Sequence, residues 1–110
     1  MKYMFSIEKG DSGYNRIILP QELKLVEYVF MDMECFARPV FQETIERVVN
    51  GVSDNENTGG NMCSLEISRD FTIVFSEFIL DGMSHECKIE TDELLALIQV
   101  WIIINKSLLY

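Results

Sequence analysis

The stretch from Thr91 to Lys106 constrains the fold most strongly, because it predicts a helix that is apolar on more than one face. Its large apolar residues are Leu94, Leu95, Leu97, Ile98, Val100, Trp101, Ile102, Ile103 and Ile104. One helical stripe cannot bury all of them. Either the helix lies deep within the fold, which is the preferred interpretation, or its surplus apolar surface meets another protein or a second copy of the chain.

A short strand is predicted directly before this helix, from His85 to Glu90. It alternates His85, Cys87 and Ile89 with Glu86, Lys88 and Glu90. We therefore expect the acidic residues to share the exposed face and the single histidine to be partly buried. Thr91 is a good N-cap for the helix, and Asp92 and Glu93 favour the positive end of its dipole.

Periodicity also predicts the elements of the first half. Residues 2–8 alternate as a strand with one buried face, which carries Tyr3, Phe5 and Ile7. A helix begins after Pro20 and covers residues 21–36, before Pro39, and a second helix covers about 40–49. The polar residues 53–61 predict a loop, in which Gly59-Gly60 is interpreted as a turn.

Two more strands are predicted between that loop and His85. Residues 63–68 carry their apolar side chains at Cys63, Leu65 and Ile67. After a turn at Arg69-Asp70, the next strand has Phe71, Ile73 and Phe75 as its apolar positions, and Asp81-Gly82 supplies another turn.

The element order is therefore strand, helix, helix, three strands, helix, or βααβββα. This order predicts an α+β fold, in which a small antiparallel sheet, made of a three-strand meander and the N-terminal strand, packs with three helices. A chain of 110 residues is long enough for one domain with its own core, so we expect a single domain over residues 1–110.

The charge of the chain is uneven. The net charge is -9, and residues 54–110 hold ten acids and three bases against eight and six in residues 1–53. An acidic protein repels nucleic acid phosphates and anionic lipids, so direct nucleic acid binding and membrane binding are disfavoured. The excess either keeps the protein soluble or provides a surface for a cationic partner.

We expect a cytoplasmic protein. An odd count of three cysteines, without a Cys-x-x-Cys pair, favours reduced thiols, and the first residues lack the apolar core of a secretion signal. The apolar run from Val100 to Ile104 is far short of the roughly 20 residues that span a bilayer.

Catalytic and metal-binding interpretations are weak. His85 and Cys87 have the spacing of a nucleophilic pair, but an orienting partner and an oxyanion site are missing from the pattern. Cys63, His85 and Cys87 lack a recognised zinc spacing. The neighbouring carboxylates at the end of the third strand and the start of the last helix are explained as solvated surface. We therefore expect no enzyme, no metal and no cofactor.

Two segments carry a resemblance to a known family. They are Gly60-Asn61-x-Cys63-x-Leu65-Glu66-Ile67 and Asp81-Gly82-Met83-Ser84-x-Glu86-Cys87-Lys88-Ile89-Glu90-Thr91-Asp92-Glu93-Leu94-Leu95-x-Leu97-Ile98-x-x-Trp101. This pattern, over residues 60–101, resembles immunity proteins of bacterial contact-dependent growth inhibition systems. The resemblance implies a cytosolic, noncatalytic inhibitor that binds the C-terminal toxin domain of an effector, often an RNase that cuts tRNA.

The acidic charge agrees with that implication, because nucleases need cationic surfaces that an acidic protein can occupy. Our hypothesis is that the toxin-facing surface includes the carboxylates of Glu66, Glu77, Asp81, Glu86, Glu90, Asp92 and Glu93. The alternative is a structural or regulatory protein that self-associates, as a homodimer, through the last helix and has no nuclease partner.

Overall fold

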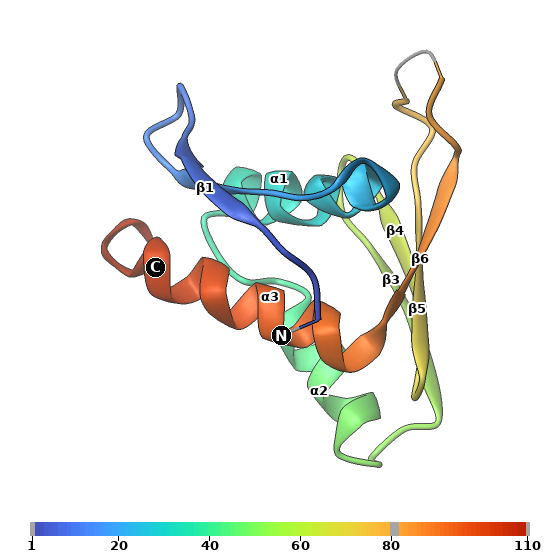
Figure 1. Cartoon of the computed structure of the whole chain (residues 1–110). Coiled ribbons are helices and arrows are strands. Elements are labelled where there is room, and N and C mark those ends of the chain that lie inside the picture. Colours follow the sequence, from blue (N-terminus) through green and yellow to red (C-terminus); the bar gives the residue numbers. More distant parts are fainter. Residues whose placement is uncertain (1, 80–81, 110) are drawn as a thin grey trace.

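A four-stranded antiparallel sheet with helices on one face is the centre of the structure, a computed structural model that describes residues 2–79 and 82–109 (Figure 1). Its strands lie in chain order: β3 (Asn55–Gly59), β4 (Ser64–Ser68), β5 (Phe71–Phe75) and β6 (Glu86–Glu90). Two further strands, β1 (Ser6–Lys9) and β2 (Asn15–Ile18), pair only with each other.

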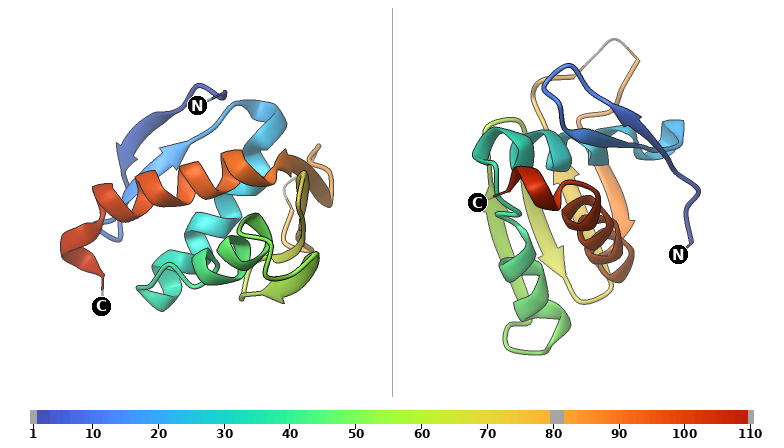
Figure 2. Two further views of the ribbon diagram at one scale, coloured as in Figure 1. Left: turned by 90° about the horizontal axis from the view of Figure 1, so that it is seen from below. Right: turned by 90° about the vertical axis from the view of Figure 1, so that its left-hand side faces the viewer.

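The helices pack against a single face of the four-stranded sheet (Figure 2). They are a 3-10 helix, η1 (Gln21–Val26), continued by α1 (Glu27–Phe36), then α2 (Gln42–Val49) and α3 (Thr91–Ile104), with a short 3-10 turn, η2 (Lys106–Leu108), after α3. The opposite face of the sheet is free of any helix or strand in the described part of the chain (Figures 1 and 2). We call it the open face.

The predicted α+β class, with three α-helices and antiparallel strands, is confirmed. The predicted order lacked β2 and β3, and the N-terminal strand belongs to the small sheet instead of the large one. The expected buried face of residues 2–8 is wrong for Ile7, because all four residues of β1 are exposed. Tyr3 and Phe5 pack on the core from the segment that precedes β1.

The helix α3 lies deep in the fold, as the first of the two alternatives required. Leu94, Leu97, Ile98 and Trp101 are fully buried among the sheet, α2 and β2. Trp101 stacks on Tyr14 with 5.9 Å between the ring centroids. Ile103 is the large apolar residue of this helix that is most exposed, at 74%, so intramolecular packing accounts for most of its apolar surface.

The strand β5 has the opposite orientation to the one that its apolar pattern suggests. Thr72 and Val74 point into the core, whereas Phe71, Ile73 and Phe75 lie on the open face. The Thr72 hydroxyl is 2.9 Å from that of Thr91, which in turn donates to the Ser68 carbonyl. A buried hydroxyl is tolerated only with such partners, so this network holds the inward position of Thr72.

Thr91 therefore does not cap α3, contrary to the sequence prediction. Glu90 is the capping residue, without a side-chain cap hydrogen bond, and Thr91 is the first residue of the helix. Its backbone N–H donates to the Asp70 carbonyl at 3.1 Å. Thr91 thus joins the start of α3 to the turn between β4 and β5.

The described residues contain no helix that combines the length and the apolar character needed to cross a membrane.

Candidate functional site

The open face is built by the alternate residues of four strands. The strand pairing places its side chains in three cross-strand rows, which are Gly59, Ser64, Phe75 and Glu86; Asn57, Glu66, Ile73 and Lys88; and Asn55, Ser68, Phe71 and Glu90. Directly paired residues of an antiparallel sheet share a face and have Cβ atoms about 5 Å apart. The outward side chains of β3, β4, β5 and β6 therefore form one contiguous surface.

Two of the predicted partner-binding carboxylates are exposed on this face, while Glu90, in its third row, is half-buried and is described below with the N-terminal segment. Glu66 is exposed in the middle of β4, beside Ile73. Glu86 is exposed at the beginning of β6, beside Phe75. They lie two strands apart, a separation of about 10 Å across the sheet, so a single partner can contact both.

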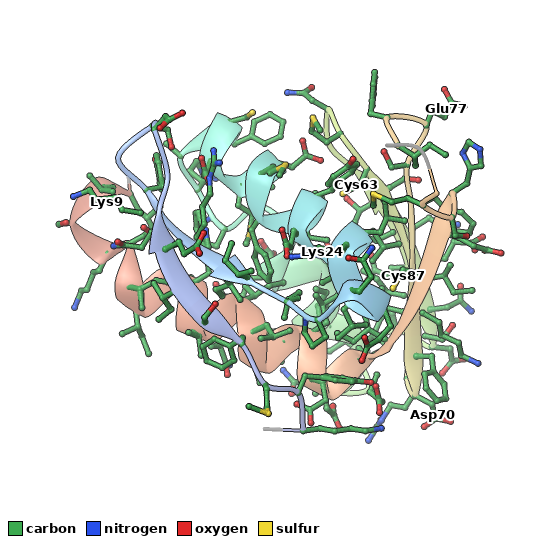
Figure 3. All side chains as sticks on the ribbon, turned by 45° about the horizontal axis from the view of Figure 1, so that its top comes forward. Lys9, Lys24, Cys63, Asp70, Glu77 and Cys87 are labelled. Atoms are coloured by element: carbon green, nitrogen blue, oxygen red, sulfur yellow. The ribbon has the colours of Figure 1, made fainter. Side chains whose placement is uncertain are left out.

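A third predicted residue, Glu77, lies just beyond the end of β5. It is exposed, and it lies at the opposite end of that strand from Asp70 (Figure 3). Glu77 lines a depression together with Phe75 and His85. Asp81, another predicted contact, lies outside the residues that the structure describes.

The other three predicted residues lie around the start of α3, next to the N-terminal segment. Glu90 accepts hydrogen bonds from Lys2 Nζ and the Tyr3 hydroxyl, and these bonds lower its pKa to about 2. Glu93 accepts from the backbone N–H of Lys2 at 2.7 Å, while Asp92 is exposed. Glu90 and Glu93 therefore have intramolecular partners, which makes them poorer contacts for another protein than Glu66, Glu77 and Glu86.

Sequence reasoning missed further charges at the lower end of the open face. Asp54 and Asp70 are exposed and line a shallow depression with Phe71 and Ile73. With Glu66, Glu77 and Glu86 they make five exposed carboxylates on this side of the molecule, against the two cations Arg69 and Lys88. Asp54 precedes β3, a segment that was predicted as a loop, whereas Asp70 lies in the turn between β4 and β5 that the sequence did predict.

An apolar stripe runs down the centre of the same face. It consists of Phe71, Ile73 and Phe75, which are consecutive outward residues of β5. Phe71 is 42% exposed, and Lys88 Nζ lies 4.1 Å from the centre of its ring. The Lys88 ammonium group therefore makes a cation–π contact with Phe71 on the open face.

The thiols are arranged for packing and not for nucleophilic chemistry. Burial and the neighbouring Asp32 carboxylate raise the pKa of Cys63, and burial together with Glu22 raises that of Cys87. Reactive thiols require the opposite shift. Cys87 Sγ donates to the Glu22 carbonyl at 3.3 Å, on the helix side of the sheet, and Figure 3 shows its side chain directed there.

His85 is exposed, so the expected partial burial is wrong. It directly precedes β6, and its Nδ1 lies 3.3 Å from the Ser76 carbonyl. Within residues 2–79 and 82–109, no three His, Cys, Asp or Glu side chains come together as a metal site.

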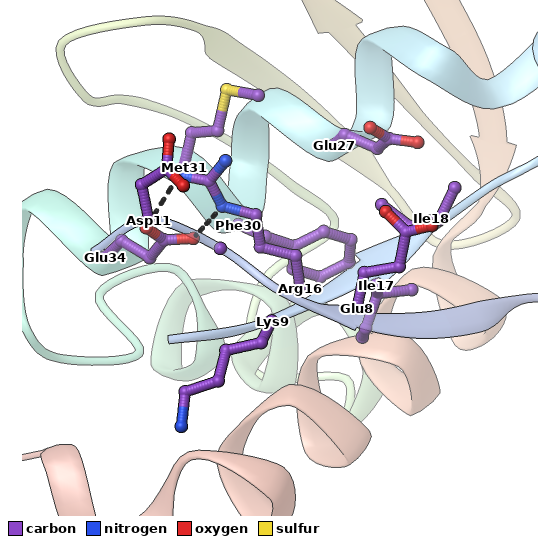
Figure 4. Close-up of a pocket in the computed structure, with 11 residues that line it drawn as sticks. Glu8, Lys9, Asp11, Arg16, Ile17, Ile18, Glu27, Phe30, Met31 and Glu34 are labelled. Carbon is purple, nitrogen blue, oxygen red and sulfur yellow. Dashed lines mark hydrogen bonds and ion pairs between the residues drawn. The ribbon is translucent and has the colours of Figure 1, made fainter. Parts of the chain in front are cut away.

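A second hollow, of about 240 Å³, lies between the small sheet and α1 (Figure 4). Three of its charged side chains, Arg16, Glu27 and Glu34, have intramolecular partners. Arg16 donates to both carboxylate oxygens of Glu34, at 3.0 and 3.3 Å, and Glu27 accepts from Lys24 and from the backbone of Leu19. These bonds make the hollow a structural junction, and the open face is the better candidate for binding.

A comparison with curated proteins found a relative in Bacillus cereus that is named "Immunity protein". It is 38% identical to the chain over 102 residues, which are 92% of the chain and 86% of the relative. The match thus covers nearly the whole of the fold. Neither a protein-family model nor a solved structure matches the chain.

Proposed function

Because the chain belongs to the immunity protein family of its Bacillus cereus relative, we propose that it binds a toxin and neutralises it. The identity of 38% over nearly the whole of both proteins is the observation that carries this proposal. Burial raises the pKa of Cys63 and of Cys87, which argues against either thiol as a nucleophile.

The finer proposal is that the toxin is the C-terminal nuclease domain of a contact-dependent growth inhibition effector, most specifically an RNase that cuts tRNA. Its support is the family resemblance of residues 60–101 together with the acidic charge of the second half of the chain. A nuclease holds phosphates with Lys and Arg side chains, and carboxylates can take the place of those phosphates. The encounter takes place in the cytoplasm, where the substrate RNA is.

We assign the toxin contact to the open face and to the carboxylates Glu66, Glu77 and Glu86. These three side chains are exposed on or beside the open face, which no described segment covers. Asp92 adds charge beyond the edge of the sheet. Glu90 and Glu93 contribute less, because contacts with Lys2 already occupy their oxygens.

Co-expression with the toxin domain encoded beside the gene tests the function. The chain should restore growth of bacteria that produce this domain, and the purified chain should stop cleavage of tRNA by the domain in vitro. A chain that neither restores growth nor binds the domain contradicts the proposal. If it binds and restores growth without affecting RNA cleavage, the immunity function stands and the nuclease assignment fails.

Charge variants test the surface. Glu66→Gln and Glu86→Gln should slow association with the toxin domain and flatten its dependence on salt, because steering by opposite charge acts mainly on the association rate. Glu8→Gln, an exposed carboxylate of β1 away from the sheet, is the matched control. Equal association rates for all three variants would argue against the open face.

A further inference from the structure

Within the described part of the molecule, no helix or strand covers the apolar stripe on β5, and Lys88 lies over the Phe71 ring at one end of it. Phe71, Ile73 and Phe75 lie in the central column of the open face, with polar or charged residues on both neighbouring strands. Ser64, Glu66 and Ser68 flank it on β4, and Glu86, Lys88 and Glu90 flank it on β6. An apolar centre with a polar rim is the arrangement of a protein-binding surface.

The orientation of β5 is what creates this stripe. The strand has the sequence Phe71-Thr72-Ile73-Val74-Phe75, and its more apolar face points away from the core. The inward face carries Thr72, whose hydroxyl is held by Thr91. Burial of apolar area alone would favour the reverse, because Phe and Ile side chains gain more from leaving water than Thr and Val side chains do.

The charges around the stripe select the kind of occupant. Asp54, Glu66, Asp70, Glu77 and Glu86 are exposed around it, against Arg69 and Lys88. A second copy of the chain would bring the same carboxylates against these, and like charges in an interface are unfavourable. The Lys and Arg side chains of a cationic partner would be attracted by these carboxylates.

We propose that the stripe is the anchor of the toxin contact: the toxin places an apolar side chain on Ile73 and cationic side chains on the carboxylates at either side. This inference rests on the proposed function and adds to it the residues that hold the complex together. Apolar anchors at the centre of an interface govern dissociation, whereas the surrounding charges govern association.

Stripe variants test the inference. The purified chain is mixed with the candidate toxin domain of the proposed function, and association and dissociation rates are measured at several salt concentrations. Phe71→Thr and Ile73→Thr should each weaken binding about tenfold or more, through faster dissociation, with an unchanged salt dependence. Threonine keeps the preference for a strand, so both variants retain the sheet.

Ile103→Thr is the matched control, since Ile103 is a 74% exposed isoleucine at the end of α3 that is far from the sheet (Figure 1). It should bind as the unchanged chain does. Phe71→Thr guards against a folding defect, because Phe71 is 42% exposed and is not part of the buried core.

The outcomes separate the two proposals. If the unchanged chain binds the toxin domain and both stripe variants bind within about twofold of it, the anchor is wrong and the proposed function stands. If the unchanged chain does not bind the domain, the proposed function fails and the anchor fails with it. Loss of self-association in the stripe variants, measured by sedimentation, would overturn the inference in favour of a second copy as the occupant.

Discussion

Replacement of Asp32 by asparagine should destabilise the protein strongly. Asp32 is a fully buried carboxylate of α1 that holds the turn between β3 and β4. Its Oδ1 accepts from the backbone N–H groups of Asn61 and Met62, at 3.0 and 2.8 Å. Its Oδ2 accepts from the N–H and the thiol of Cys63, at 3.1 and 3.4 Å.

The magnitude follows from these contacts. The asparagine side chain would keep one carbonyl oxygen for Asn61 and Met62, and each of these bonds would weaken from about 2 to about 1 kcal/mol once the charge is gone. The new NH₂ group would face the Cys63 N–H, leaving a buried donor unsatisfied at a cost of about 2 kcal/mol. Relief of the carboxylate desolvation offsets about 2 kcal/mol of this, because the effective penalty of a buried ion is several kcal/mol and the asparagine still buries a polar side chain. The net loss is about 2 kcal/mol, a substantial part of the about 5–15 kcal/mol that stabilises a domain.

Urea unfolding measures this loss. Trp101 is the only tryptophan, and it is buried against Tyr14, so its fluorescence reports the global transition. Asp32→Asn should lower the midpoint with little change of slope. Asp54→Asn, an exposed aspartate, should stay within about 0.5 kcal/mol of the unchanged chain. If Asp32→Asn is as stable as this control, the hydrogen bonds to the turn do not contribute as calculated.

Three further predictions concern other contacts. Asn105→Ala should lower the free energy of unfolding by about 3 kcal/mol in the same assay, because the buried Asn105 side chain bonds both backbone groups of Asn15, at 2.7 and 3.0 Å. Replacement of the exposed Gln99 by alanine should have little effect. Hydrogen bonds from Arg47 and Ser53 lower the pKa of Glu56 from 4.5 to about 2, so the stability that it contributes is complete above pH 4.5 and disappears as the pH falls toward 2. Glu56→Gln should therefore be less stable than the unchanged chain at pH 7, and this gap in urea midpoints should close near pH 2; a gap independent of pH would contradict the assignment. A thiol reagent should modify the exposed Cys35 first, Cys87 slowly because of its raised pKa, and the buried Cys63 only on unfolding, which mass spectrometry of digested samples can follow; equal rates at Cys35 and Cys63 would argue against this packing.

Several local features of the fold could be predicted from the sequence. The strands β4 and β6 have strict alternation, so their inward residues Leu65, Ile67 and Ile89 and the outward Glu66 and Glu86 follow from the pattern. The apolar excess of α3 required either deep burial or a partner, and the helix is buried. The exposure of Glu66, Glu77, Glu86 and Asp92 was likewise expected from residue type and position.

Other elements depend on distant residues. The sequence of β3, Asn55–Gly59, is polar and predicts a loop, but Glu56 binds Arg47 of α2 at 2.7 Å and the segment pairs with β4 along its length. The small sheet formed by β1 and β2 is fixed in the same way, since Asn15 bonds Asn105 across ninety positions of the chain. Hydrophobic periodicity does not reveal such contacts, because they depend on which segments meet in the fold.

The α+β class, the deep burial of the last helix and the acidic second half all follow from the residue order. Hydrophobic periodicity and net charge are local properties, so they can be read without the fold. The buried face of β5 depends on the tertiary structure. Both faces of this strand are apolar enough for a core, and the hydroxyl contact between Thr72 and Thr91 favours burial of the Thr72 face. That choice turns Phe71, Ile73 and Phe75 outward among the carboxylates. The contacts of Lys2 with Glu90 and Glu93 likewise join segments far apart in the sequence, so no local pattern contains them.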